Sequence, residues 1–186
     1  MPSVVLQEDI AGRERSGERG TSFAELMVFL ALTGILLAMT ANYAVAWISR
    51  EDLRHAVSEI RTELQAARTF AISRNRACRF QINTLTRQIQ VYDLVDPANN
   101  ADDILLETKR LPDAVFFQRP DTGSAVTLPL LAGTTYQATF ESHGGVSSSV
   151  GVVHMRGGDR YGRVTLHAAG GVKIERWMSS AWEVGT

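Results

Sequence analysis

The sequence predicts an α+β fold, in which a long N-terminal helix is followed by an antiparallel β-sheet domain. Three observations support this prediction. An apolar run covers residues 26–48, a helical spacing of apolar residues continues to residue 77, and an alternation of polar and apolar residues begins at Cys78. A chain of 186 residues has room for one domain of ordinary size and a few accessory segments.

The apolar run is long enough to cross a membrane. Residues 1–20 are polar and glycine-containing, and we expect them to form an unstructured leader. Residues 21–48 hold a single charged residue, Glu25, and residues 26–48 would span about 34 Å as a helix. A hydrocarbon core is about 30 Å thick. Because the arginines of the leader lie next to the run, we expect a single span with a cytoplasmic N-terminus.

Residues 49–77 have the pattern of an amphipathic helix. Apolar residues recur there at spacings of three and four, which places them on one side of a helix. They are Leu53, Val57, Ile60, Leu64, Ala67 and Ala71, whereas Arg54, Glu59, Arg61, Glu63 and Arg68 lie off this stripe. No proline or glycine interrupts residues 35–75, so we expect both parts to form one helix of about 50 residues.

Residues 78–186 have the alternation of a β-rich globular domain. Residues 79–82 and 88–92 are typical of a hairpin. Further strands are expected at 104–111, 115–118, 136–141, 150–155, 163–167 and 172–177. We expect the second half of the long helix to cover one face of an antiparallel sheet.

Several function classes find no support in the sequence. It has no nucleophile elbow, P-loop or dinucleotide fingerprint, so we predict neither an enzyme nor a cofactor. A net charge of −1 gives no overall attraction to nucleic acid or anionic lipid. The lone cysteine, Cys78, allows no intramolecular disulfide, and we expect it to be packed where helix meets strand.

No metal site is predicted either. The four histidines, His55, His143, His154 and His167, lack the spacing of metal ligands. The loop at residues 93–103 has enough oxygen atoms for Ca²⁺ but does not match an EF-hand, so we expect a solvated acidic loop. Its polar residues are Asp93, Asp96, Asn99, Asn100, Asp102 and Asp103.

The segment at residues 20–28 combines a glycine at the membrane boundary with a lone acid in the apolar run. Gly20 has no Cβ, which leaves its bond to Thr21 sterically open to a peptidase. An acid at the centre of a membrane helix costs about 2.5–3.5 kcal/mol on insertion scales, less near the interface, so Glu25 needs a partner. Cleavage after Gly20 would create one, the amino group of Thr21.

This segment resembles the cleavage and assembly signal of type IV pilins and type II secretion pseudopilins. The matching residues are Gly20, Glu25, Leu26, Met27, Val28 and Gly34. The resemblance implies that prepilin peptidase removes residues 1–20 and that Thr21 is then N-methylated, although the family commonly has phenylalanine at that position. It also implies that Glu25 neutralises the amino group of an adjacent subunit in a filament.

The resemblance implies partners and a location as well. The partners are prepilin peptidase, other pseudopilins or pilins of the same filament, and an inner-membrane assembly platform. The location is the bacterial inner membrane, with the C-terminal domain in the periplasm.

A weaker resemblance narrows the choice within this family. Residues 66–75, 139–145, 163–166 and 170–174 are similar to the layout shared by the pseudopilin GspH and the minor pilin FimT. The first implies a minor subunit of a type II secretion pseudopilus that aids protein export. The second implies a minor pilin of type IV pilus machinery, which in some members is linked to DNA uptake.

Near the C-terminus, two aromatic residues are interspersed with a group of cationic residues. A basic face with aromatic rings could bind phosphates and stack bases, and the alternative is a solvated strand face. The cations are Arg156, Arg160, Arg163, Lys173 and Arg176, and Tyr161 and Trp177 lie among them.

Other interpretations of the N-terminus remain open. Glu25 could be a boundary acid that the helix macrodipole favours. Ala44-Val45-Ala46 imitates a secretory cleavage site, which would make Trp47 the first mature residue. A plain single-pass protein with an unrelated domain would keep Met1.

Overall fold

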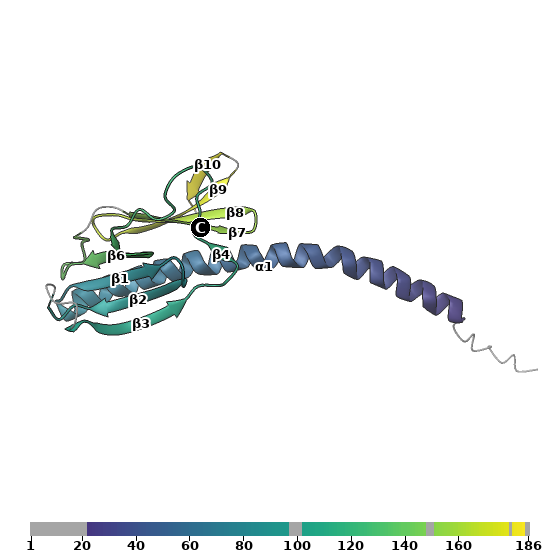
Figure 1. Ribbon diagram of the computed structural model, residues 1–186, viewed down its shortest axis with the longest axis horizontal. Helices are drawn as coiled ribbons and strands as arrows, with labels where there is room; N and C mark the ends of the chain where they lie inside the picture. The colour runs from purple at the N-terminus through teal and green to yellow at the C-terminus, as the bar shows by residue number, and fades with distance from the viewer. Residues whose placement is uncertain (1–21, 97–101, 148–150, 179, 185–186) are drawn as a thin grey trace, which may run out of the picture. The chain divides into compact units, whose positions relative to one another are not determined.

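The computed structural model describes residues 22–96, 102–147, 151–178 and 180–184. Within these ranges the chain forms one long helix and ten strands (Figure 1). This confirms the predicted α+β class. The chain divides into two compact units, Met1–Ala41 and Asn42–Thr186.

Helix α1 (Phe23–Arg74) is 52 residues long, close to the length that the sequence predicts. It begins where the Ser22 carbonyl accepts hydrogen bonds from the amides of Glu25 (2.9 Å) and Leu26 (3.1 Å). It ends at Arg74, and the next residue, Asn75, adopts a positive φ of 50°. The Arg76 amide then donates to the Ala71 carbonyl over 3.2 Å, a pairing that closes many helix C-termini.

The described residues of the second unit form two antiparallel sheets, where the sequence analysis expected one. The first sheet has the order β3-β2-β1-β6-β5 and the second β10-β9-β8-β7-β4. The first contains β1 (Cys78–Asn83), β2 (Gln88–Asp93), β3 (Ile104–Arg110), β5 (Leu130–Ala132) and β6 (Thr135–Phe140). The second contains β4 (Val115–Phe116), β7 (Gly151–Gly157), β8 (Arg160–Leu166), β9 (Val172–Met178) and β10 (Ala181–Val184).

Strands β5 and β10 were not predicted. Strand β5 is three exposed residues long and pairs only with β6, so it has no buried face to produce an alternation. Strand β10 pairs with β9 through Trp182 opposite Trp177, and three of its four side chains are exposed. Both are edge strands whose position depends on pairing with a neighbour rather than on burial.

The second half of α1 packs against both sheets, through Val57 near Gly162 of β8 and Glu59 near Lys109 of β3, and supplies the centre of the core; Figure 1 shows it running alongside the strands. All six residues of the predicted stripe, from Leu53 to Ala71, are buried. Phe80 and Ile82 from β1 and Val164 from β8 pack in the same cluster. Cys78 is fully buried at the start of β1, as expected, and burial raises the pKa of its thiol to about 11.

Strand β8 approaches α1 closely through Gly162. A Cβ atom at this position would lie 2.9 Å from Cγ2 of Val57, so a larger residue would push the sheet away from the helix. The absence of a side chain at Gly162 thus lets β8 pack close to Val57 of the helix stripe.

Glu63 departs from the prediction, because it is only 2% exposed although its spacing places it off the stripe. The side chain lies beside Glu107 of β3 and near Glu59 and Lys109. Burial, with the charge of Glu107 as the next cause, raises the pKa of Glu63 to about 7. Sequence spacing missed this because the first sheet covers a second side of α1.

Glu63 should therefore make stability depend on pH. Its folded pKa of about 7 lies above its ordinary value of 4.5, so the folded state holds a proton that the unfolded state loses between these values. Stability falls as pH rises through this window. We expect Glu63→Gln to raise the free energy of unfolding by about 1–3 kcal/mol at about pH 8 and by little at about pH 5.

Urea unfolding of the chain in detergent micelles, followed by tryptophan fluorescence, measures this effect. Glu183→Gln serves as the control, since Glu183 is exposed on β10 and is not among the groups that shift the pKa of Glu63, so it should change the profile little. Equal effects of Glu63→Gln at both pH values would contradict the assignment.

Candidate functional site

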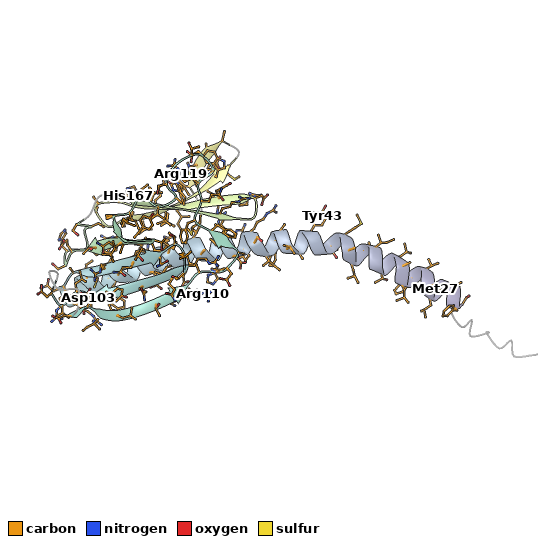
Figure 2. All side chains as sticks on the ribbon, in the orientation of Figure 1. Met27, Tyr43, Asp103, Arg110, Arg119 and His167 are labelled. Atoms are coloured by element: carbon orange, nitrogen blue, oxygen red, sulfur yellow. The ribbon has the colours of Figure 1, made fainter. Side chains whose placement is uncertain are left out.

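The N-terminal unit offers a long apolar surface. Every large apolar side chain from Phe23 to Met39 is exposed. The most apolar window of α1 has a mean hydropathy of 2.1, and none of it is buried. Met27 projects from the helix in Figure 2 and is 58% exposed. By length and composition α1 could cross a membrane.

Polar groups inside this apolar segment are satisfied within the helix itself. The Thr33 hydroxyl donates to the Phe29 carbonyl over 2.8 Å, and the Thr40 hydroxyl donates to the Leu36 carbonyl over 3.1 Å. These bonds satisfy the hydroxyl group within the helix, so it needs no partner in the hydrocarbon. Among the described residues 22–41, the carboxylate of Glu25 is the charged group, and it has no such bond within the helix.

Glu25 lies in the first turn of α1, and its side chain is exposed. No ion pair joins it to another residue in the part of the chain that the structure describes. Gly20 and Thr21, the predicted cleavage and methylation positions, lie outside the described residues, as does the whole leader at residues 1–20.

The five predicted basic residues do not share one face. Successive side chains of a strand point to opposite faces, and β8 buries Gly162, Val164 and Leu166 against the core. Arg163 therefore lies on the outer face of the sheet, as do Tyr161 and Thr165. Arg156 lies opposite Tyr161 and Lys173 lies opposite Thr165 in the neighbouring strands, so both share this outer face. Arg160, two residues before Gly162, and Arg176, opposite Gly162, instead lie on the side of the sheet that faces α1.

On the outer face, Glu175 pairs with two of the three cations. Its carboxylate lies 2.6 Å from Nε of Arg163 and 3.0 Å from Nζ of Lys173. The hydrogen bond from Arg163 is the main cause that lowers the pKa of Glu175 to about 2. Arg156 donates to the Gly158 carbonyl and to the Gln118 side chain.

Trp182 completes this outer face, although the sequence analysis did not identify it. The Arg163 guanidinium lies 4.4 Å from the Trp182 ring centroid, and Trp177 packs edge-on against the same ring at 5.2 Å. His154 lies 5.3 Å away, and burial lowers its pKa. Trp182 reaches the outer face because strand β10, which was not predicted, pairs with β9. The spacing of residues along the chain therefore could not predict this position.

The helix-facing side forms a groove of about 490 Å³ between α1 and the ends of β8 and β9. We call it the arginine groove, because the described residues that line it include five arginines and one carboxylate, Glu51. The arginines are Arg50, Arg54, Arg61, Arg160 and Arg176. Arg54 and Arg61 were predicted only to lie off the apolar stripe, and Arg50 was not predicted as a site residue, although the helical spacing of the three already places them on one side of α1.

The acidic loop does not gather a metal site in its described part. Asp93 is buried and pairs with Arg74 over 2.7 Å, and Asp103 pairs with Arg79. Asn99 and Asn100 lie outside the described residues. No group of three or more potential metal ligands occurs among the residues that the structure describes. Asp93 and Asp103 therefore act as partners of arginines.

Comparison with known proteins identifies relatives. The family model described as type II transport protein GspH matches residues 56–170, which is more than half of the chain. No curated protein sequence matches the chain.

Two kinds of solved structure are similar. The minor pseudopilin EpsH from the type 2 secretion system of Vibrio cholerae is 13% identical with a TM-score of 0.50, over 66% of this chain and 95% of EpsH. The type IV minor pilin FimU of Pseudomonas aeruginosa PAO1 is 16% identical with a TM-score of 0.51, over 74% of this chain and 96% of FimU. At these identities the similarity concerns the fold.

Proposed function

Because the chain belongs to the GspH family, whose members are minor pseudopilins and related minor pilins, we propose that it is a minor subunit of a type II secretion pseudopilus. In this role it aids protein export as a structural component. The observation that best supports the proposal is a membrane-length apolar helix with one acid, Glu25, in its first turn, joined to a domain that matches the family model.

We further propose that prepilin peptidase cuts between Gly20 and Thr21. The cut leaves a positively charged amine at the start of α1, which is then a substrate for N-methylation. In hydrocarbon the low effective dielectric strengthens the attraction between this amine and a carboxylate. Glu25 of one subunit would neutralise the amine of the next and so set the axial register of the helices in the filament.

The family is anchored in the inner membrane, and α1 is the segment able to provide the anchor. We propose a single span with the leader in the cytoplasm and residues 49–186 in the periplasm. The partners would be the peptidase, the other pseudopilins and the assembly platform. No catalytic role is proposed for any residue.

Deleting the gene tests the system in which the protein acts. We expect the deletion strain to lose export of folded proteins while it keeps surface pili, with export restored by the full chain. The readouts are the amount of secreted enzyme in the medium and the amount of pilin sheared from cells. Normal secretion with lost piliation would reject the secretion role and favour a type IV pilus minor pilin.

The alternative function is that of a FimT-like minor pilin with a part in DNA uptake. The fold similarity to FimU and the aromatic, cationic outer face favour it. Against it, Glu175 already pairs with Arg163 and Lys173, so few charges on this face are free for a phosphate.

A gel shift distinguishes the two functions. We expect the chain in detergent to give no shift of duplex DNA at low salt, whereas Glu175→Gln frees two cations and gives a salt-sensitive shift. A matched control is Glu183→Gln, which removes an exposed acid from β10 without releasing a cation. A low-salt shift by the unmodified chain, lost in Arg163→Gln, would favour the DNA-uptake alternative.

A further inference from the structure

The arginine groove has an excess of positive charge in a chain whose net charge is −1. Arg50 and Arg160 share one acid, Asp159, at 3.1 Å and 4.0 Å. Arg54 pairs with Glu51 at 3.3 Å. Neither Arg61 nor Arg176 pairs with an acid in the part of the chain that the structure describes. The groove is therefore electrostatically suited to an anion.

The floor of the same groove is apolar. Leu53 and Val57 of α1 face Gly162 and Ile174 of the sheet, and Trp47, Trp177 and Met178 lie at its rim. Trp47 is 65% exposed and Met178 is 45% exposed. A free phosphate or a nucleic-acid backbone would use the arginines and leave this apolar surface in water. An amphiphile with an anionic head would use both.

One end of the groove adjoins helix residues that belong to the apolar run. Tyr43, Val45 and Ile48 are exposed and precede Arg50 on α1, and Figure 2 shows Tyr43 projecting from the helix. At 1.5 Å per residue, Arg50 and Arg54 lie about 3 and 9 Å along the helix beyond Ile48. The polar headgroup layer on each side of a bilayer is about 5–8 Å thick, so the backbone of Arg50 lies within this layer and that of Arg54 lies just beyond it, close enough for its long side chain to reach back.

The sheet brings Arg160 and Arg176 to this same end. Arg176 lies opposite Gly162 in the register of β8 and β9, and Arg160 precedes Gly162 by two residues. Gly162 itself lies next to Val57 and Leu53 of α1. The Asp159 ion pair fixes the β7–β8 turn beside Arg50. Arg61 lies about 20 Å beyond Ile48 along the helix, which is too far from the hydrocarbon to take part.

We propose that this end of the arginine groove binds the phosphate of an anionic glycerophospholipid. Arg50, Arg54, Arg160 and Arg176 contact the headgroup, and the acyl chains lie along the exposed apolar residues 43–48. Tryptophan is enriched at both membrane–water interfaces, and basic residues next to a membrane surface attract anionic headgroups. The proposal requires α1 to be inserted in a membrane, and it does not depend on a role in a filament.

Quenching of tryptophan fluorescence by brominated lipids tests the proposal. The full chain is placed in bilayers of equal parts phosphatidylcholine and phosphatidylglycerol, with bromine on one lipid or on the other. Trp47 lines the groove and reports binding there, whereas the rings of Trp177 and Trp182 pack against each other on the outer face of the sheet and give a constant background. The ratio of the two quenching curves measures the relative binding of phosphatidylglycerol at the groove.

We expect the unmodified chain to prefer phosphatidylglycerol, and Arg54→Gln/Arg176→Gln to reduce that preference by about fivefold for each arginine. High salt should weaken the preference. The charge-matched control is Arg76→Gln/Arg110→Gln, which removes two exposed arginines outside the groove and should keep the preference. Near-ultraviolet circular dichroism checks that all variants are folded.

Equal quenching by the two lipids in the unmodified chain would overturn the proposal, and so would an unchanged preference in Arg54→Gln/Arg176→Gln. If the lipids quench equally but this variant fails to enter filaments, the groove instead holds an acidic segment of a neighbouring subunit. Because the bilayers contain no other subunit, a negative result leaves the proposed filament role standing.

Discussion

Glu25→Ala is expected to abolish incorporation of the chain into filaments while its domain stays folded. Glu25 lies in the first turn of a helix whose neighbouring side chains are apolar, and no described residue pairs with it. Without this carboxylate, the amine created by cleavage stays unneutralised in hydrocarbon when subunits pack. We expect the amount of the chain in sheared filaments, measured by immunoblot, to fall by about tenfold or more.

The control for this experiment is Glu51→Ala. Glu51 also lies on α1 and is exposed, but it already pairs with Arg54. It should change incorporation little, because surface ion pairs contribute at most about 1 kcal/mol. Normal incorporation of Glu25→Ala would show that the acid has no role in assembly and would favour the boundary-acid interpretation.

Gly170→Ala should have the largest effect on the folded domain. Gly170 has a φ of +76°, and an added Cβ would lie 2.1 Å from the carbonyl oxygen of Gly144, a backbone atom that cannot turn aside. The loops of these two glycines are joined by a hydrogen bond from the Val146 amide to the Ala168 carbonyl, and Arg68 of α1 donates to the Gly170 carbonyl. The added methyl group would push the Gly170 loop away from the Gly144 loop and from Arg68 of α1.

The combined cost of the positive φ and of the forced shift should be about 2–4 kcal/mol, a large share of the stability of an ordinary domain. Urea unfolding measures it. Gly171→Ala is the matched control, since no atom lies within 4 Å of its added Cβ and its φ is not positive. Equal stability of the two variants would contradict the packing described for this junction.

The parts of the fold that depend on local pattern could be predicted from the sequence. The stripe from Leu53 to Ala71 follows the helical period, and the β1–β2 hairpin follows the period of a strand, so both were found. The number of sheets could not be found in this way. Strand β6 pairs with β1 across more than fifty residues of chain, and no local pattern encodes such a pairing.

The candidate sites divide in the same manner. The lone acid Glu25 and the apolar run are properties of a continuous segment, which the sequence shows directly. The arginine groove joins α1 to strands more than a hundred residues later, and the outer face depends on Trp182 of the unpredicted β10. The five cations near the C-terminus were found, but their division between two faces depends on strand register.

The N-terminal residue of the protein purified from membranes tests the central proposal most directly. Edman sequencing or intact mass should show a chain that begins at Thr21, and Gly20→Ala should retain the leader. A mature protein that begins at Met1 would indicate a simple membrane anchor, and one that begins at Trp47 would indicate a secretory signal. Either result would contradict processing by prepilin peptidase and the filament role that follows from it.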